Sequence, residues 1–247
     1  CKSDMLIKGQ NPENIVLGNT LNEDGHSGKH YRYLISNPPF GVDWKTEKDF
    51  VENEHSTQGF KGRFGAGTPR VSDGSLLFLQ NMISKMYQDE EGSRIAIIFN
   101  GSPLFTGDAG SAESNIRKWI IESDMLEGII ALPTDLFYNT GISTYIWVLT
   151  NKKSAERRGK IQLLNASEFY KPMRKSLGNK RKEIQDTQIE EIVKIYSEYK
   201  ESEICKIFDN DDFGFRKITV ERPLKLKFQK KKKKIEEFKG TTAFVNL

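Results

Sequence analysis

Cysteine is nearly absent from this sequence of 247 residues, in which only Cys1 and Cys205 occur. Two cysteines cannot build a disulfide framework, and their separation lacks the paired spacing of a zinc site. No apolar run approaches the roughly 20 residues that span a bilayer, and no charged-then-apolar signal pattern opens the chain. These absences exclude secreted disulfide scaffolds and predict a soluble chain, without membrane contact, in a reducing cytoplasm.

A strong excess of charge is also missing, because 38 basic side chains face 34 acidic ones and leave a net charge of +4. Global electrostatics therefore gives little reason to expect nucleic-acid binding, and local clusters would have to provide it. His26 and His30 have an i, i+4 spacing, but Gly25 and Gly28 indicate a loop and no third ligand stands nearby. We therefore predict no metal site.

Apolar residues make up 36% of the sequence, enough for the core of one large domain or two small ones. Strand-like and helix-like patterns alternate along it, which predicts a mostly parallel α/β sheet. The expected strands are 15–21, 33–36, 94–99, 127–133, 145–151 and 159–167, and the expected helices are 72–87 and 112–123. The polar, glycine-containing segment 46–71 has neither period and predicts a long mobile loop.

The composition shifts after residue 151, and we place a domain boundary near 165. Residues 166–247 are expected to form a smaller α+β extension. It would contain a basic loop at 171–183, a helix opened by a capping box from Thr187 to Glu190, and strands at 204–208 and 215–221. A run of lysines at 230–234 closes this region, and its role is left open.

The stretch Asn37-Pro38-Pro39-Phe40 follows an apolar run directly. Two prolines fix φ and donate no backbone hydrogen bond, so the strand ends in a stiff loop. Methylation of an exocyclic amine needs acceptors for its N–H groups, because the nitrogen lone pair is delocalised into the ring. The Asn37 amide oxygen and a neighbouring carbonyl can accept both protons, and Phe40 offers a face for an extruded base. Alone, however, such a stretch is equally consistent with an ordinary turn.

Five stretches occur in an order that resembles a known family: SNPPFG, DGSLLFLQNMISKM, RIAIIFNGSPLFTGDAGSAESNIRKWIIESD, IIALPTDLFYNTGISTYIWVLTNKK and GKIQLLNAS. Together with the residues around them, at about 1–225, they resemble the modification (N6-adenine DNA methyltransferase) subunit of type I restriction-modification systems. The resemblance implies a Rossmann-like sheet of order 3-2-1-4-5-7-6. It also implies S-adenosylmethionine as methyl donor without a metal, DNA as substrate, and a sequence-specificity subunit and a restriction subunit as partners.

Carried over to this sequence, the resemblance implies that Asn37 and the Pro38 carbonyl bind the target amine while Phe40 stacks on the base. Phe137 matches the position of a second aromatic against the flipped base, although Leu132 and Leu136 nearby are equally compatible with a core position. Asn19 is a weak candidate for a contact with the adenine of the methyl donor, and Asn37 would also face the donor.

The sequence departs from the family at the donor-binding motif, a glycine-rich turn after the first strand. Its only Gly-x-Gly, at 65–67, follows a polar run instead of an apolar strand. We therefore expect that motif upstream of Cys1. The sequence then begins at the third strand as a piece of the catalytic domain, residues 1–165 being the part present, and the piece alone would be inactive.

Three basic residues of the segment 46–71, Lys61, Arg63 and Arg70, are candidates for phosphate contacts, although a solvated loop explains them nearly as well. Two other functions stay open. The same acceptors would suit amino methylation of a protein glutamine or of RNA, and a piece without a donor site would suit a catalytically silent module that binds other subunits.

Overall fold

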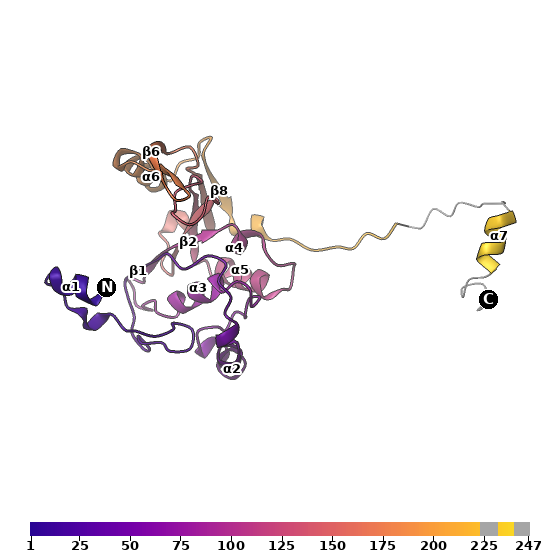
Figure 1. Ribbon diagram of the computed structural model, residues 1–247, viewed down its shortest axis with the longest axis horizontal. Coiled ribbons are helices and arrows are strands. Elements are labelled where there is room, and N and C mark those ends of the chain that lie inside the picture. The colour runs from indigo at the N-terminus through magenta and orange to yellow at the C-terminus, as the bar shows by residue number, and fades with distance from the viewer. Residues whose placement is uncertain (223–231, 240–247) are drawn as a thin grey trace. The chain divides into compact units, whose positions relative to one another are not determined.

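The computed structural model describes residues 1–222 and 232–239 (Figure 1). These fall into two units, Cys1–Phe215 and Arg216–Leu247. The helices are α1 (Lys2–Ile7), α2 (Lys48–Gln58), α3 (Ser75–Ile83), α4 (Ser102–Phe105), α5 (Ala112–Glu122), α6 (Asp186–Glu198) and α7 (Lys232–Lys239). The strands are β1 (Tyr33–Ser36), β2 (Arg94–Asn100), β3 (Leu126–Ala131), β4 (Thr144–Thr150), β5 (Lys160–Asn165), β6 (Lys171–Leu177), β7 (Lys180–Glu183) and β8 (Cys205–Asp209).

Six strands form one sheet in the order β1-β2-β4-β3-β5-β8. β6 and β7 form a separate hairpin, so the prediction of a basic loop at 171–183 is wrong. The sheet is mixed, because β1 and β2, and β3 and β5, are parallel whereas the other three pairs are antiparallel. The prediction of a mostly parallel sheet is therefore wrong. The order β1-β2-β4-β3 nevertheless matches the 4-5-7-6 half of the sheet that the resemblance implies.

Alternation along the strands divides the core between the two faces of the sheet. Trp147 of β4 and Ile97 of β2 lie in a cluster with Leu79 of α3 and Ile116 of α5, so these two helices cover one face. The alternate residues of the strands face the other side of the sheet. Ile130 of β3 is one of them, and it lies in a second cluster with Ile192 of α6. The predicted helix 72–87 is confirmed as α3, and the helix 112–123 as α5.

Two predicted strands are wrong. Residues 15–21 contain no strand, and Leu17 there is 96% exposed; residues 215–221 likewise carry no helix or strand. An extended apolar run becomes a strand only where a neighbouring strand takes its backbone hydrogen bonds, and neither run has such a neighbour among the described residues.

The segment 46–71 is not the predicted loop, because α2 occupies much of it. Only Val51 and Glu54 of α2 are buried, and Glu54 is held by an ion pair, so the helix lacks the apolar period by which it would be recognised. The helix α6 begins before the expected capping box. Its N-cap is Gln185, whose backbone N–H donates to the side chain of Gln188.

The β8 strand pairs with β5, so the sheet continues beyond residue 165; the boundary there stays a prediction. No helix within the described residues is long and apolar enough to cross a membrane. Of the lysine run 230–234, residues 230 and 231 lie outside the described residues.

Candidate base-binding site

The Asn37 to Phe40 turn leaves β1 at the carboxyl end of that strand. Pro38 is buried, Phe40 is half-buried, and Asn37 and Pro39 are exposed. Gly41 then adopts φ +61°, in the left-handed region that favours glycine. Because Pro38 and Pro39 each fix φ, and Gly41 adopts a positive φ that other residues rarely take, the turn is held in a defined shape with the Asn37 side chain exposed to solvent.

The turn is anchored just beyond Gly41. The Gly74 N–H donates to the Val42 carbonyl at 3.0 Å, and the Trp44 N–H donates to the Val71 carbonyl at 3.0 Å. The Trp44 ring is 1% exposed, and its Nε1 donates to the Arg70 carbonyl at 3.0 Å. Trp44 is therefore an anchor inside the protein, and its burial excludes a direct contact with DNA.

The structure brings Phe40 and Phe137 together, although 97 positions separate them in sequence. Their ring centroids lie 5.8 Å apart at 89°, an edge-to-face contact. Phe137 lies in the segment between β3 and β4, beyond the carboxyl end of β3, and it is half-buried. The two aromatic residues proposed for base stacking thus share one place at the edge of the sheet where Asn37 lies.

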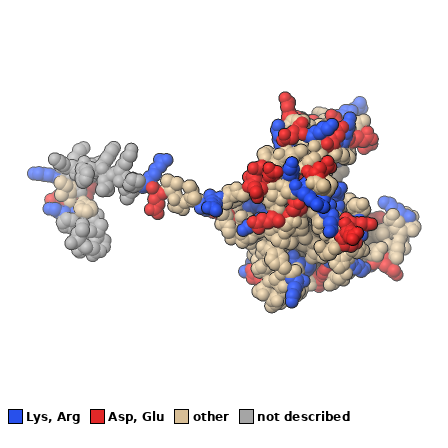
Figure 2. All heavy atoms as spheres, turned by 180° about the vertical axis from the view of Figure 1, so that it is seen from behind, with Lys and Arg blue, Asp and Glu red and all other residues tan. Residues whose placement is uncertain are grey.

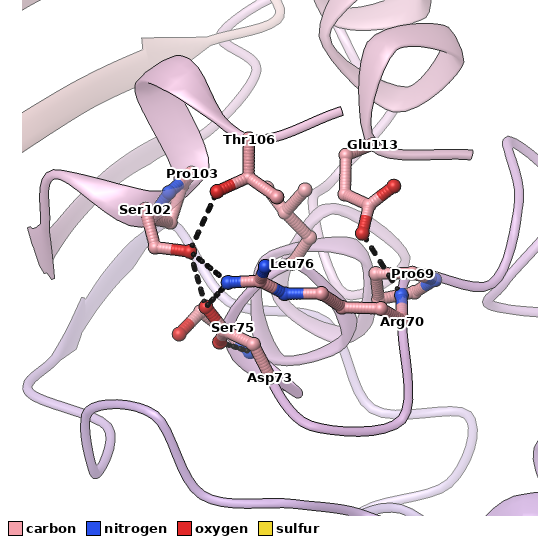
Figure 3. A pocket seen from close by; sticks show the side chains of 9 residues that line it. All are labelled: Pro69, Arg70, Asp73, Ser75, Leu76, Ser102, Pro103, Thr106 and Glu113. Carbon is pink, nitrogen blue, oxygen red and sulfur yellow. Dashed lines mark hydrogen bonds and ion pairs between the residues drawn. The ribbon is translucent and has the colours of Figure 1, made fainter. Parts of the chain in front are cut away.

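Arg70 lies in a polar network at the same edge (Figure 3). Its guanidinium donates to Ser102 Oγ at 3.0 Å, and that hydroxyl donates to Asp73 Oδ2 at 2.6 Å. Its backbone N–H donates to Glu113 at 2.9 Å. The Arg70 side chain is half-exposed, so its remaining donors can reach a ligand, and its carbonyl is the one that anchors Trp44.

Sequence reasoning missed Asp73 and Ser102, which fix Arg70 in this network. Asp73 lies two residues before the first residue of α3, and Ser102 is the first residue of α4. Ser, Thr, Asp and Asn at such positions indicate the start of a helix and could have drawn attention to both residues. A buried neighbour, the Ser75 hydroxyl, has no hydrogen-bond partner among the described residues.

The loop after α4 is held by Arg117 of α5. Its guanidinium donates to the Pro103 carbonyl at 3.0 Å and to the Thr106 carbonyl at 2.7 Å. Burial lowers the pKa of Arg117, partly offset by Glu113. An arginine stays charged despite such a shift, so Arg117 keeps the charged guanidinium that donates to these carbonyls.

Arg63 lies elsewhere and has internal partners. Its guanidinium pairs with Glu54 at 2.7 Å, the two side chains being 11% and 9% exposed. It also donates to the carbonyls of Thr20 at 2.7 Å and Leu21 at 2.8 Å, and to Asn81 at 3.2 Å. These contacts occupy the guanidinium, so its surroundings do not support the expected phosphate contact.

Lys61 is exposed and lines a polar hollow together with His30 and Lys85. The Lys85 carbonyl accepts from the Tyr31 N–H just before β1, which places this hollow toward the amino end of the strand. The structure therefore separates Lys61 from Arg70 and from the turn at the carboxyl end of β1.

The described residues fit a methyl-donor pocket poorly. Both ends of the Asn19 amide are used internally, because Nδ2 donates to Glu47 at 2.7 Å and Oδ1 accepts from the Leu21 N–H at 3.0 Å. The Gly65 to Gly67 turn follows a helical segment, and a Cβ on Gly65 would lie 2.7 Å from Phe60 backbone. Of the residues predicted to contact the methyl donor, only Asn37 remains a candidate.

Within residues 1–222 and 232–239, no cluster of three His, Cys, Asp or Glu side chains has the arrangement of a metal site.

The matching family model is that of a DNA methylase, and the matching relatives are methylase subunits. The family model described as N-6 DNA Methylase matches residues 1–232. The MjaVIII methylase subunit of a type I restriction enzyme from Methanocaldococcus jannaschii is 29% identical over 180 residues, which are 72% of this chain and 29% of that protein. The corresponding EcoKI subunit from Escherichia coli is 30% identical over 138 residues, 55% of this chain and 22% of that protein. The chain thus spans under a third of the length of these relatives.

Solved structures agree in fold. A type I restriction-modification methyltransferase subunit from Streptococcus thermophilus superposes with a TM-score of 0.67 at 23% identity, covering 85% of this chain and 42% of that one. A modification subunit of a type I restriction enzyme from Vibrio vulnificus gives 0.57 at 17% identity, with 83% and 40% covered.

Proposed function

The chain belongs to the N-6 DNA methylase family, and from that premise we propose that it holds the target base in methylation of adenine N6 in DNA. The observation that supports this most is the placement of Phe40 against Phe137, beside an exposed Asn37 at the carboxyl end of β1. Two aromatic rings next to an exposed amide on a stiff turn suit a planar base that carries an amine.

The chemistry of this site follows from the amine. Its two N–H groups would donate to the Asn37 amide oxygen and to the Pro38 carbonyl, which withdraws the nitrogen lone pair from the ring. The same two oxygens stabilise the positive charge that develops on nitrogen during methyl transfer. Because the prolines hold the backbone of the turn, including the Pro38 carbonyl, before the base arrives, little reorganisation of the backbone is needed. The family implies S-adenosylmethionine as the methyl donor.

Phe40 would stack on the extruded base and offset part of the cost of unstacking it from the duplex. The pair of aromatic rings favours a nucleobase over a protein glutamine, whose amide lacks an aromatic ring. Arg70 is the one predicted phosphate contact whose half-exposed side chain lies at this edge of the sheet.

We further propose that the chain acts within a type I restriction-modification complex, together with a sequence-specificity subunit and a restriction subunit. The relatives are methylase subunits of type I restriction enzymes. In such a division of labour this chain would hold the target base, and the specificity subunit would read the DNA sequence.

Replacement of Asn37 tests the proposal in the intact protein that contains this chain. Asn37→Ala removes one of the two acceptors, and we expect transfer of a tritiated methyl group to DNA to fall about 100-fold or more. Binding of S-adenosylmethionine, followed by calorimetry, should stay near normal. Asn53→Ala, an exposed position on α2, is the matched control. Incorporation at the unmodified rate in Asn37→Ala would refute the proposed role.

A further inference from the structure

The hairpin of β6 and β7 has an unusual charge. Residues 171–183 contain six basic side chains and a single acidic one, Glu183, whereas the entire sequence has a net charge of +4. On the face of the Cys1–Phe215 unit seen in Figure 2, Lys and Arg side chains are interspersed with Asp and Glu. The hairpin is thus a local cationic element in a chain with otherwise balanced charge.

Two of its lysines pack against the protein. Lys180 Nζ lies 5.3 Å from the ring centroid of Tyr138, and Lys182 Nζ lies 3.9 Å from that of Tyr170. Lys182 also donates to Thr134 Oγ1 at 3.2 Å. Because side chains alternate along a strand, Arg181 points to the opposite face of β7.

The other four cations are Lys171, Arg174, Lys175 and Arg181, and all are exposed. None of them forms an ion pair with any described residue. Glu183, the single acidic residue of the hairpin, stands opposite Lys171 in the ladder, so no acidic side chain of the hairpin lies opposite Arg174, Lys175 or Arg181. Their charge is therefore available to a ligand.

The hairpin is joined to the segment that carries Phe137. The Asn179 N–H donates to the Tyr138 carbonyl at 2.9 Å, and the Arg181 N–H donates to the Asp135 carbonyl at 2.9 Å. Gly178 fits here at φ +62°, where a Cβ would lie 2.6 Å from the Tyr138 carbonyl oxygen. Backbone hydrogen bonds on both sides of Phe137 thus fix the position of the hairpin relative to the aromatic pair.

We propose that the β6–β7 hairpin binds the phosphodiester backbone of DNA beside the extruded base, an inference that rests on the proposed function. A base that leaves the duplex for the Phe40–Phe137 site brings its flanking phosphates with it. Unpaired lysine and arginine side chains on an element bonded to that site are the groups that neutralise phosphates. An acidic surface of a protein subunit is the competing partner, and the hydrogen bonds that fix the hairpin beside Phe137 favour DNA over it.

Salt dependence of DNA binding tests the inference. The intact protein would be titrated into a fluorescent DNA duplex of mixed sequence, with anisotropy recorded between about 50 and 200 mM salt. Replacing Arg174, Lys175 and Arg181 together by glutamine should weaken binding about tenfold or more and reduce the slope of log K against log salt by about 3. The effect should be equal for different duplex sequences, because phosphates carry no sequence information.

The control removes the same charge elsewhere. Lys118, Lys194 and Lys200 are exposed, and their joint replacement by glutamine should leave the slope nearly unchanged. Thermal melting of both variants checks folding. An equal loss in the control, or an unchanged slope in the hairpin variant, would overturn the inference, as would loss of a co-purifying subunit with DNA binding intact. Failure of the proposed function would appear differently, as wild-type methyl transfer by Asn37→Ala.

Discussion

Phe40 and Phe137 illustrate what a single pair of side chains contributes. Phe40 follows two prolines and has its position fixed locally, whereas Phe137 reaches the same place from the segment between two other strands. Their contact is edge-to-face, so the rings leave an aromatic face for a third planar group.

Alanine at either position should weaken retention of the extruded base. Stacking on an aromatic ring contributes about 1 to 3 kcal/mol for each base, so Phe40→Ala or Phe137→Ala should lower affinity for DNA with an extruded base about tenfold. Fluorescence of 2-aminopurine at the target position measures this. Phe50→Ala, on α2, serves as control. If the fluorescence of 2-aminopurine is the same with Phe40→Ala, with Phe137→Ala and with the unmodified protein, this pair does not stack on the base.

At the scale of elements, one buried ion pair joins three parts of the fold. Arg63 follows α2, pairs with Glu54 of that helix, and donates both to Asn81 of α3 and to the carbonyl of Leu21. Its guanidinium also lies over the Phe64 ring, 4.6 Å from the centroid. Arg63 thus holds together the segment that the sequence predicted to be a mobile loop.

Removal of Arg63 should therefore destabilise the protein. Arg63→Ala leaves Glu54 buried without its partner, which costs about 3 to 5 kcal/mol in the free energy of unfolding. Lys61→Ala, two residues earlier and exposed, should change it by less than about 0.5 kcal/mol. Urea unfolding of the two variants compares them directly, and equal stabilities would show that the pair does not hold these elements together.

At the scale of the whole molecule, Asp124 links the end of α5 to the sheet and to the residues after β8. It has φ +54°, and its carboxylate accepts from Lys153 Nζ at 2.6 Å, from the Gly159 N–H at 3.0 Å and from Asn210 at 3.0 Å. Burial opposes ionisation of Asp124, but the bonds from Lys153, Gly159 and Asn210 outweigh it and lower its pKa.

Acid should weaken this link. Because the pKa of Asp124 is lower in the folded protein than in the unfolded chain, its contribution is complete above the unfolded value near 3.9 and is lost as pH falls through the folded value. Asp124→Asn, which tolerates positive φ, should lower the free energy of unfolding by about 1 to 3 kcal/mol at neutral pH.

The difference between Asp124→Asn and the unmodified protein should shrink below about pH 4. Urea unfolding at neutral and acidic pH measures it. Asp211→Asn, an exposed aspartate, is the control and should behave like the unmodified protein at both. A difference that stays constant across this range would mean that ionisation of Asp124 does not stabilise the fold.

Local patterns were sufficient for most of the central elements. Strands β1, β2, β3, β4, β5 and β8 and helices α3 and α5 were all expected within a few residues, because short apolar runs indicate strands and the helical period of apolar residues indicates helices. The turn at Asn37 could also be predicted, because proline restricts its backbone φ angle and glycine readily adopts a positive one. The family resemblance added the order of four strands.

Only the tertiary structure decided how β5 and β8 extend the sheet, that β6 and β7 form a hairpin, and which polar groups are buried. Helix α2 was missed because Glu54 is held by Arg63 instead of by apolar contacts, and the run 15–21 is no strand because no described strand lies beside it. The contact of Phe40 with Phe137, and the bonds from the β6–β7 hairpin to the Phe137 segment, join residues far apart in the chain. A local pattern cannot specify such contacts, because hydrogen bonds and packing between distant segments depend on where the whole chain places them.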